Sequence, residues 1–228
     1  SAIDLALWDL AGKAAGKPVY ELLGGPVKPY IPVYASALHP VGAEKVQAEA
    51  KAYVEEGYQA MKMRFPYGPG HGIAGMRANE EHVANVRDAV GDDIEIMADA
   101  YMGWDFLYAK KMVKRLEPYQ LARLEEAFLP DDLNSYAKLR QETSIPISGG
   151  EHEYTRFGFQ QIIEKQAMDI IQPDLRRCGG LSEGRRICSL ALANGITVIP
   201  HAYGPTHIHF ALAETAVPMI EYFPIPSW

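Results

Sequence analysis

Short apolar runs alternate with longer segments of helical periodicity along most of the chain. The short runs have the length of strands in a parallel sheet. The longer segments repeat apolar residues every three or four positions, as one face of an amphipathic helix does. Such alternation is typical of βα units, in which helices connect parallel strands. The pattern therefore predicts an α/β fold.

Eight strands and seven intervening helices follow from this pattern, which indicates a TIM-type (β/α)7β barrel. The predicted strands are 31–35, 60–65, 94–98, 121–124, 145–150, 169–174, 196–200 and 219–223. The predicted helices are 43–56, a helix capped by Asn79, 106–116, 133–141, 157–165, 181–193 and 210–216. The Gly/Pro-rich stretch 66–75 is long for a βα connection and is a candidate active-site loop.

The first 25 residues differ from the rest of the chain. They contain a helical segment rich in apolar residues, then Gly16-Lys17-Pro18 and a short helical turn over 19–23. We interpret 1–25 as a lead-in segment and 26–228 as the barrel domain, because no low-complexity stretch or interdomain linker follows residue 26.

Three acidic residues each follow a predicted strand at equal intervals of 26 residues: Asp99, Glu125 and Glu151. In a parallel barrel the carboxyl ends of the strands meet at one mouth, so these carboxylates would repel one another unless a cation neutralised them. Mg²⁺ prefers oxygen ligands and is the simplest candidate. Glu126 directly follows Glu125, and strand alternation sends neighbouring side chains to opposite faces. Only Glu125 preserves the interval.

Asp174 and His201 end the sixth and seventh predicted strands. At neighbouring strand ends, the carboxylate can accept a hydrogen bond from one imidazole nitrogen and leave the other available as a base. Glu221 lies on the eighth predicted strand, where it is either a functional acid or a rim residue. His152, His207 and His209 are open between packing and substrate contact.

Composition narrows the possible classes of protein. The 228 residues are 48% hydrophobic, enough to bury a sizeable core, and the formal net charge of −7 argues against a nucleic-acid partner. No apolar run approaches the roughly 20 residues of a membrane span. The only cysteines, Cys178 and Cys188, lack metal-type spacing, and no signal segment is evident, so we expect a cytoplasmic protein with reduced thiols.

Several spaced motifs together resemble the barrel domain of the enolase superfamily, mandelate racemase branch. The opening Ala6–Lys13 and Leu22–Gly25 segments resemble the family's entry into its barrel, and the three acids and the Asp-His pair stand at the matching strand ends. Within the branch, the chain is most similar to rhamnonate dehydratases and related sugar-acid dehydratases. The residues behind that likeness are Lys62-Met63, Tyr67-Gly68-Pro69, Gly150-Glu151-His152, Gln172-Pro173-Asp174, Cys178-Gly179-Gly180-Leu181 and Pro200-His201.

The resemblance implies a set of roles. The expected Mg²⁺ ligands are Asp99, Glu125 and Glu151; the expected catalytic residues are His201, Asp174, Glu221 and Lys62; and Arg64 and His152 are expected to contact substrate. It further implies a homo-oligomer that acts on a small carboxylate, and a separate N-terminal capping domain that is absent from this chain. A Lys or His base beside Mg²⁺ is the general scheme of this superfamily.

The expected reaction is removal of the α-proton of a sugar acid, an aldonate such as rhamnonate, and elimination of its 3-hydroxyl to give a 2-keto-3-deoxy acid. Arg64 replaces the second lysine of the family's Lys-x-Lys motif. A guanidinium is a poor base, which disfavours racemisation. Two alternatives remain: a racemase, epimerase or other enolase-type enzyme acting on a carboxylate, and a non-catalytic sugar-acid binding protein. Ala127 also departs from the family, where proline is common.

Overall fold

A computed structural model describes residues 1–224 and divides the chain into two compact units. The central unit comprises Tyr34–Ser148 together with residues 223 and 224. The terminal unit comprises Ser1–Val33 and Gly149–Tyr222. The unit boundaries fall inside two strands, β1 (Val33–Ser36) and β5 (Ile147–Gly149).

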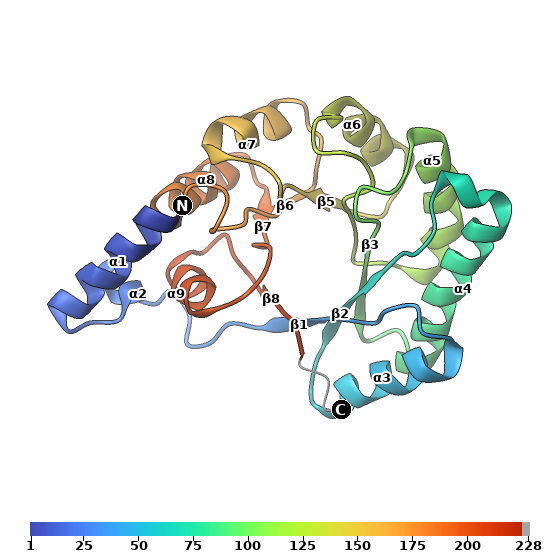
Figure 1. Cartoon of the computed structure of the whole chain (residues 1–228), viewed down its shortest axis with the longest axis horizontal. Coiled ribbons are helices and arrows are strands. Elements are labelled where there is room, and N and C mark those ends of the chain that lie inside the picture. Colours follow the sequence, from blue (N-terminus) through green and yellow to red (C-terminus); the bar gives the residue numbers. More distant parts are fainter. Residues whose placement is uncertain (225–228) are drawn as a thin grey trace. The chain divides into compact units, whose positions relative to one another are not determined.

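The central unit is built from parallel strands with helices along their outer side (Figure 1). Besides β1 and β5, its strands are β2 (Ala60–Arg64), β3 (Glu95–Asp99) and β4 (Arg123–Glu125). Its helices are α3 (Ala43–Glu55), η1 (Pro69–His71), α4 (Gly72–Val90), α5 (Phe106–Leu116), η2 (Glu117–Tyr119) and α6 (Leu133–Glu142). Successive strands pair in chain order, as βα units require.

The strand register places polar residues side by side in two rows. Residues paired across parallel strands point to the same face, and so do residues two apart on one strand. One row consists of Ser36, Lys62, Met97 and Arg123. The next row, nearer the carboxyl ends of the strands, consists of Arg64, Asp99, Glu125 and Ser148. The sheet itself therefore brings basic and acidic side chains together.

One capping prediction is wrong in this unit. Helix α4 begins at Gly72, so Asn79 lies inside the helix and not at its start. Asn79 is fully buried, and its side-chain amide donates to the Tyr67 carbonyl at 2.9 Å and to the Tyr108 hydroxyl at 3.3 Å. These tertiary partners accept both hydrogen bonds of an amide NH₂ group that sequence alone would place at a helix end. The predicted loop 66–75 is correspondingly shorter.

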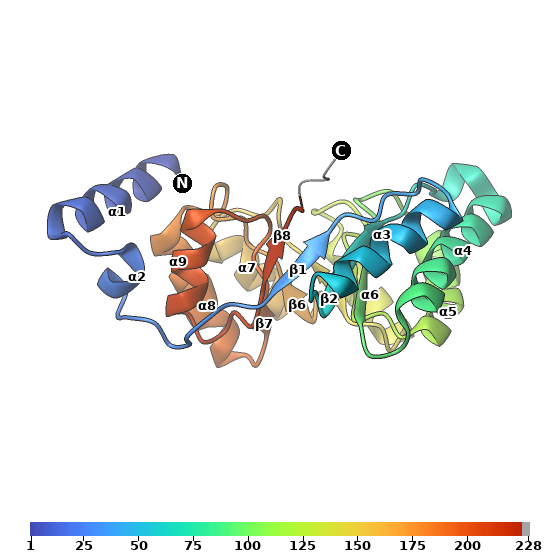
Figure 2. The same cartoon turned by 90° about the horizontal axis from the view of Figure 1, so that it is seen from below.

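The terminal unit packs the first two helices against later ones. It contains α1 (Ala2–Ala15), α2 (Val19–Leu22), α7 (Thr155–Glu164), β6 (Ile170–Ile171), α8 (Leu181–Ala193), β7 (Thr197–Val198), α9 (Pro205–Ala213) and β8 (Ile220–Tyr222). Figure 2 shows α2 beside α9. The Trp8 indole on α1 donates to the Ser182 hydroxyl at 2.9 Å, and Asp4 accepts from the Ser182 backbone N–H at 3.1 Å. Asp4 thus caps α8 from another helix.

The α/β prediction is confirmed, with eight strands, seven intervening α-helices and two short 3₁₀ helices among the described residues. Within the central unit the strand order is β5-β4-β3-β2-β1, and within the terminal unit β6 pairs in parallel with β7. Strands β6 and β7 have only two residues each, so Asp174 and His201 lie three residues beyond them. Helix α9 begins five residues earlier than predicted because Pro205, favoured at the first helical position, starts it. Within residues 1–224, no helix combines the length and apolar character needed to cross a membrane.

Candidate active site

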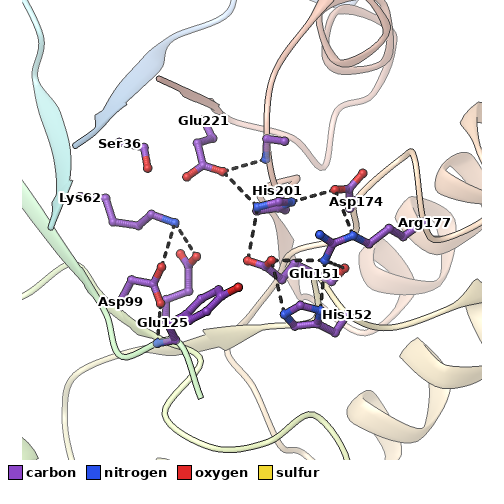
Figure 3. A network of polar contacts seen from close by, with 12 residues as sticks. Ser36, Lys62, Asp99, Glu125, Glu151, His152, Asp174, Arg177, His201 and Glu221 are labelled. Carbon is purple, nitrogen blue, oxygen red and sulfur yellow. Dashed lines mark hydrogen bonds and ion pairs between the residues drawn. The ribbon is translucent and has the colours of Figure 1, made fainter. Parts of the chain in front are cut away.

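Lys62, Asp99 and Glu125 form a buried charged cluster in the central unit (Figure 3). The Lys62 ammonium hydrogen-bonds to Glu125 Oε1 and lies 3.8 Å from Asp99 Oδ2. All three side chains are almost completely shielded from solvent. An ammonium between two carboxylates offsets part of their repulsion, so the cluster is held together by charge.

Arg123 holds the other oxygen of Glu125. Its Nη2 donates to Glu125 Oε2 at 3.1 Å and to the Tyr34 hydroxyl at 2.8 Å. The guanidinium carbon lies 4.8 Å from the centre of the Tyr34 ring, a cation–π distance. Arg123 is 1% exposed and Glu125 is fully buried. Lys62 therefore contacts one carboxylate oxygen of Glu125, and Arg123 contacts the other.

The crowded, buried surroundings of Asp99 change the pKa of its carboxyl group. Burial and the neighbouring Glu125 carboxylate raise the pKa of Asp99 to about 6, although Lys62 and Arg64 act in the opposite direction. One Asp99 oxygen, Oδ1, also accepts the Tyr101 backbone N–H at 2.8 Å. Asp99 and Glu125 are adjacent buried carboxylates, and together they form an oxygen-rich position that suits a hard divalent cation.

Arg64 borders this cluster on the more exposed side. Its Nε lies 3.9 Å from Asp99 Oδ2, and its Nη2 lies 3.4 Å from the Ser36 hydroxyl. The guanidinium carbon is 6.0 Å from the centre of the Phe223 ring. With 28% of its side chain exposed, Arg64 presents a permanent positive charge that a bound carboxylate can reach.

His201 and Asp174 form a dyad in the terminal unit (Figure 3). His201 Nδ1 lies 2.8 Å from Asp174 Oδ2, while Asp174 Oδ1 accepts the Arg176 backbone N–H at 2.7 Å. Both oxygens of the aspartate are thus engaged, which fixes its orientation. Hydrogen bonding at Nδ1 leaves Nε2 as the nitrogen that can take a proton.

Carboxylates surround the second nitrogen of His201. Its Nε2 lies 3.4 Å from Glu151 Oε2 and 4.0 Å from Glu221 Oε2. Burial favours the neutral ring, but the hydrogen bond to Asp174 and the charges of Glu151 and Glu221 outweigh it and raise the pKa of His201. The reciprocal interaction lowers the pKa of Asp174 despite its burial. The dyad is consequently an ionised aspartate holding a basic imidazole.

Arg177 links the remaining groups of this unit. Its Nη1 lies 3.3 Å from Glu151 Oε1 and 3.1 Å from His152 Nδ1, and its Nε lies 3.8 Å from Asp174 Oδ2. His152 also approaches Glu151 at 3.5 Å. A single guanidinium therefore balances the two carboxylates nearest His201.

The predicted site residues fall into two groups. Lys62, Arg64, Asp99 and Glu125 meet in the central unit, whereas Glu151, His152, Asp174, His201 and Glu221 meet in the terminal unit. The interval of 26 residues matches the register only once, because Asp99 pairs with Glu125 but Glu125 pairs with Ser148. Glu151 lies in a turn beyond β5. The assignment of the three acids as one ligand set stays a prediction.

Glu126 does not share the role of Glu125 in the central cluster. It follows the end of β4 with a φ of +43°, and its carboxylate, together with burial, raises the pKa of Tyr136. Glu125 contacts Lys62 and Arg123. Within the central unit, this arrangement favours Glu125 as the partner of Asp99.

Two residues of these networks were not identified from the sequence, Arg123 and Arg177, and a third, His207, is open between packing and substrate contact on sequence alone. Arg123 lies two residues before Glu125, so strand alternation could have placed both on one face. Arg177 lies in the loop after β6, where no periodicity fixes side-chain direction. His207 lies in α9 and contacts the His201 backbone, a relation that no sequence pattern indicates.

Comparison with known protein families identifies the class. Residues 45–227 match the model described as "Enolase C-terminal domain-like", and residues 1–24 match the "Mandelate racemase / muconate lactonizing enzyme, N-terminal domain". The first match covers well over half of the chain. The chain therefore belongs to the enolase superfamily, in the group named after mandelate racemase and muconate lactonizing enzyme.

Individual proteins of known name are similar to this chain over nearly its whole length. L-rhamnonate dehydratase of Saccharopolyspora erythraea is 38% identical over 97% of this chain and 55% of its own length. The structure of rhamnonate dehydratase from Gibberella zeae complexed with Mg is 38% identical, with a TM-score of 0.88 over 98% of this chain and 53% of that chain. The 3,6-anhydro-D-galactonate cycloisomerase from Zobellia galactanivorans is 33% identical, with a TM-score of 0.85 over 99% of this chain and 63% of that one.

The chain spans about half the length of the curated relatives that it matches. The similarity to dehydratases extends over nearly all of this chain, including both charged clusters. The predicted membership of the enolase superfamily is thereby confirmed.

Proposed function

We propose that this protein is a Mg²⁺-dependent sugar-acid dehydratase that converts an aldonate such as rhamnonate into a 2-keto-3-deoxy acid. The observation that carries the proposal is the His201–Asp174 dyad, which leaves Nε2 directed away from the aspartate as a base. The similarity to rhamnonate dehydratases supports the substrate class.

Asp99, Glu125 and Glu151 would hold the metal. Asp99 and Glu125 fit this role because they are adjacent buried oxygen donors, and the raised pKa of Asp99 reflects its burial and then the negative charge of Glu125, which a cation would offset. When bound, Mg²⁺ supplies positive charge at the substrate carboxylate and so favours loss of the neighbouring α-proton. Arg64 adds a second positive charge for the same carboxylate.

His201 performs both proton transfers of the elimination. Nε2 takes the α-proton, and Asp174 stabilises the resulting imidazolium through Nδ1–H. The imidazolium then gives this proton to the departing 3-hydroxyl, which leaves as water. The enol that remains tautomerises to the 2-keto-3-deoxy acid. Lys62 and Glu221 complete the proposed catalytic set, and His152 would contact substrate.

A second candidate is an isomerisation on the same scaffold, since the cycloisomerase from Zobellia galactanivorans is structurally similar over nearly the whole chain. Proton return to the opposite face of the α-carbon needs a second base. Lys62 on β2 is the candidate, and Glu125 and Asp99 hold its ammonium in place. Arg64, the other cationic residue of that strand, does not deprotonate.

A screen of the complete protein against a sugar-acid library with Mg²⁺ tests the proposal. The expected result is a 2-keto-3-deoxy product from a small number of aldonates. Recovery of inverted substrate carrying solvent deuterium would instead identify a racemase or epimerase. Binding of sugar acids without any product would identify a non-catalytic binding protein. Homo-oligomerisation and a cytoplasmic location stay predictions.

Glu151→Gln should lower both Mg²⁺ affinity and activity, because the substitution keeps the side-chain shape but removes a ligand charge. Isothermal titration with Mn²⁺ as the probe measures the affinity. Glu164→Gln is a suitable control, because it changes an exposed glutamate of the same unit. Unchanged metal binding in Glu151→Gln would remove Glu151 from the ligand set.

A further inference from the structure

The peptide group between His201 and Ala202 is held by both of its polar atoms. On one side, Glu221 Oε2 accepts the Ala202 backbone N–H at 2.7 Å. On the other side, the His207 ring hydrogen-bonds to the His201 backbone. Glu221 is contributed by β8 and His207 by the first turn of α9, so two different elements grip one peptide plane.

This peptide has a conformation that it would not adopt unaided. Ala202 has a φ of +68°, in the left-handed region that is unfavourable for residues with a Cβ atom. Rotating the peptide plane by half a turn would bring φ back to a negative value and relieve that strain. Such a flip would also change ψ of His201, the residue that carries the proposed base. Strain of this kind persists only where surrounding groups hold it.

His207 is suited to donating one hydrogen bond without adding charge. The ring is 1% exposed, and burial lowers its pKa to about 4, so the imidazole is neutral near pH 7. Among the described residues, Nε2 has no hydrogen-bond partner. The bond to the His201 carbonyl therefore comes from Nδ1–H. A neutral ring here does not repel the imidazolium that His201 forms during turnover.

We propose that Glu221 and His207 are positioning residues that lock the His201–Ala202 peptide against flipping and thereby keep the His201 imidazole on Asp174. The inference rests on the proposed role of His201 as base. In this proposal, Glu221 fixes the orientation of the peptide through the Ala202 N–H, in addition to any contact with substrate. His207, which belonged to no functional set, becomes part of the support of the dyad.

Substitutions at His207 test its proposed positioning role, because the amide of asparagine and that of glutamine each replace one of the two ring nitrogens. Asparagine places its NH₂ group near the position of Nδ1, whereas glutamine places it near Nε2. We expect His207→Leu and His207→Gln to lower kcat by about 10²-fold, as small misplacements of a catalytic group do. KM and Mn²⁺ affinity should stay unchanged. His207→Asn should stay within a few-fold of wild type. His209→Leu, on the same helix but less buried, is the control.

Hydrogen exchange gives a readout that needs no activity. Loss of one hydrogen bond at this peptide should speed exchange of the Ala202 amide by about tenfold in His207→Leu but not in His207→Asn. Equal exchange rates in these two variants, or equal losses of kcat, would refute the proposed positioning role of His207. Should His207→Leu fail to fold, the comparison of His207→Asn with His207→Gln decides. An inactive wild-type protein would refute the proposed function, while the exchange rate of the Ala202 amide would still test whether His207 holds this peptide.

Discussion

His201→Asn should abolish turnover and also stop exchange of the substrate α-proton with solvent. Both losses are expected together, because the proposed reaction uses His201 Nε2 to remove the α-proton and then to protonate the departing hydroxyl. A general base or acid typically contributes about 10²–10⁴-fold, so a residue used in both steps should lie at or beyond the upper end. Proton NMR in D₂O measures exchange and turnover in one sample.

Metal binding provides the control for this variant, since His201 is not in the proposed ligand set and Mn²⁺ affinity should be nearly unchanged. Asp174→Asn should be milder. The Asp174 hydrogen bond and charge help to raise the pKa of His201, so their removal should move the acidic limb of the pH–rate profile to lower pH. Deuterium entering the α-position in His201→Asn would reveal a second base, with Lys62 the first residue to examine.

Arg123→Met should be the most destabilising single substitution in the buried network of the central unit. It removes the cation that holds Glu125 Oε2 and the Tyr34 hydroxyl, while leaving a fully buried carboxylate in place. Removing one member of a buried ion pair typically costs about 3–5 kcal/mol. Urea denaturation followed by circular dichroism measures the change in unfolding free energy.

Two comparisons separate buried charge from simple loss of packing. Arg115→Met breaks the Arg115–Glu80 pair at 2.7 Å, whose side chains are 32% and 29% exposed, and should cost no more than about 1 kcal/mol. Combining Arg123→Met with Glu125→Gln should be less harmful than Arg123→Met alone, because the buried group that loses its arginine then carries no charge. Equal destabilisation by the Arg123 and Arg115 substitutions would show that Glu125 does not depend on Arg123.

The His201 and Arg123 substitutions test the same feature of the protein: its proposed functional acids are already paired with basic side chains. Glu125 contacts Lys62 and Arg123, while Asp174 contacts His201 and lies near Arg177. These pairs keep the carboxylates oriented before any ligand arrives, which reduces the cost of organising the site at the moment of reaction.

The order and type of the elements could be predicted from the sequence because periodicity reports which face of each segment is buried. Helices 106–116 and 181–193 begin and end as predicted, and Asp99 and Glu125 indeed end their strands. Asn79 does not cap its helix because its amide NH₂ group donates to Tyr67 and Tyr108, which are distant in sequence. Local capping rules contain no information about such partners.

The sequence by itself determined the α/β alternation, the acids Asp99 and Glu125 at the ends of their strands and, through the resemblance of its motifs, the superfamily. Residue type and spacing suffice for these, because strand ends of parallel βα units meet at one edge. Only the tertiary structure decided the partners: Arg123 on Glu125, Arg177 between Glu151 and Asp174, and His207 on the peptide that carries His201. Side-chain direction in loops and contacts between distant elements depend on packing, which no local pattern encodes.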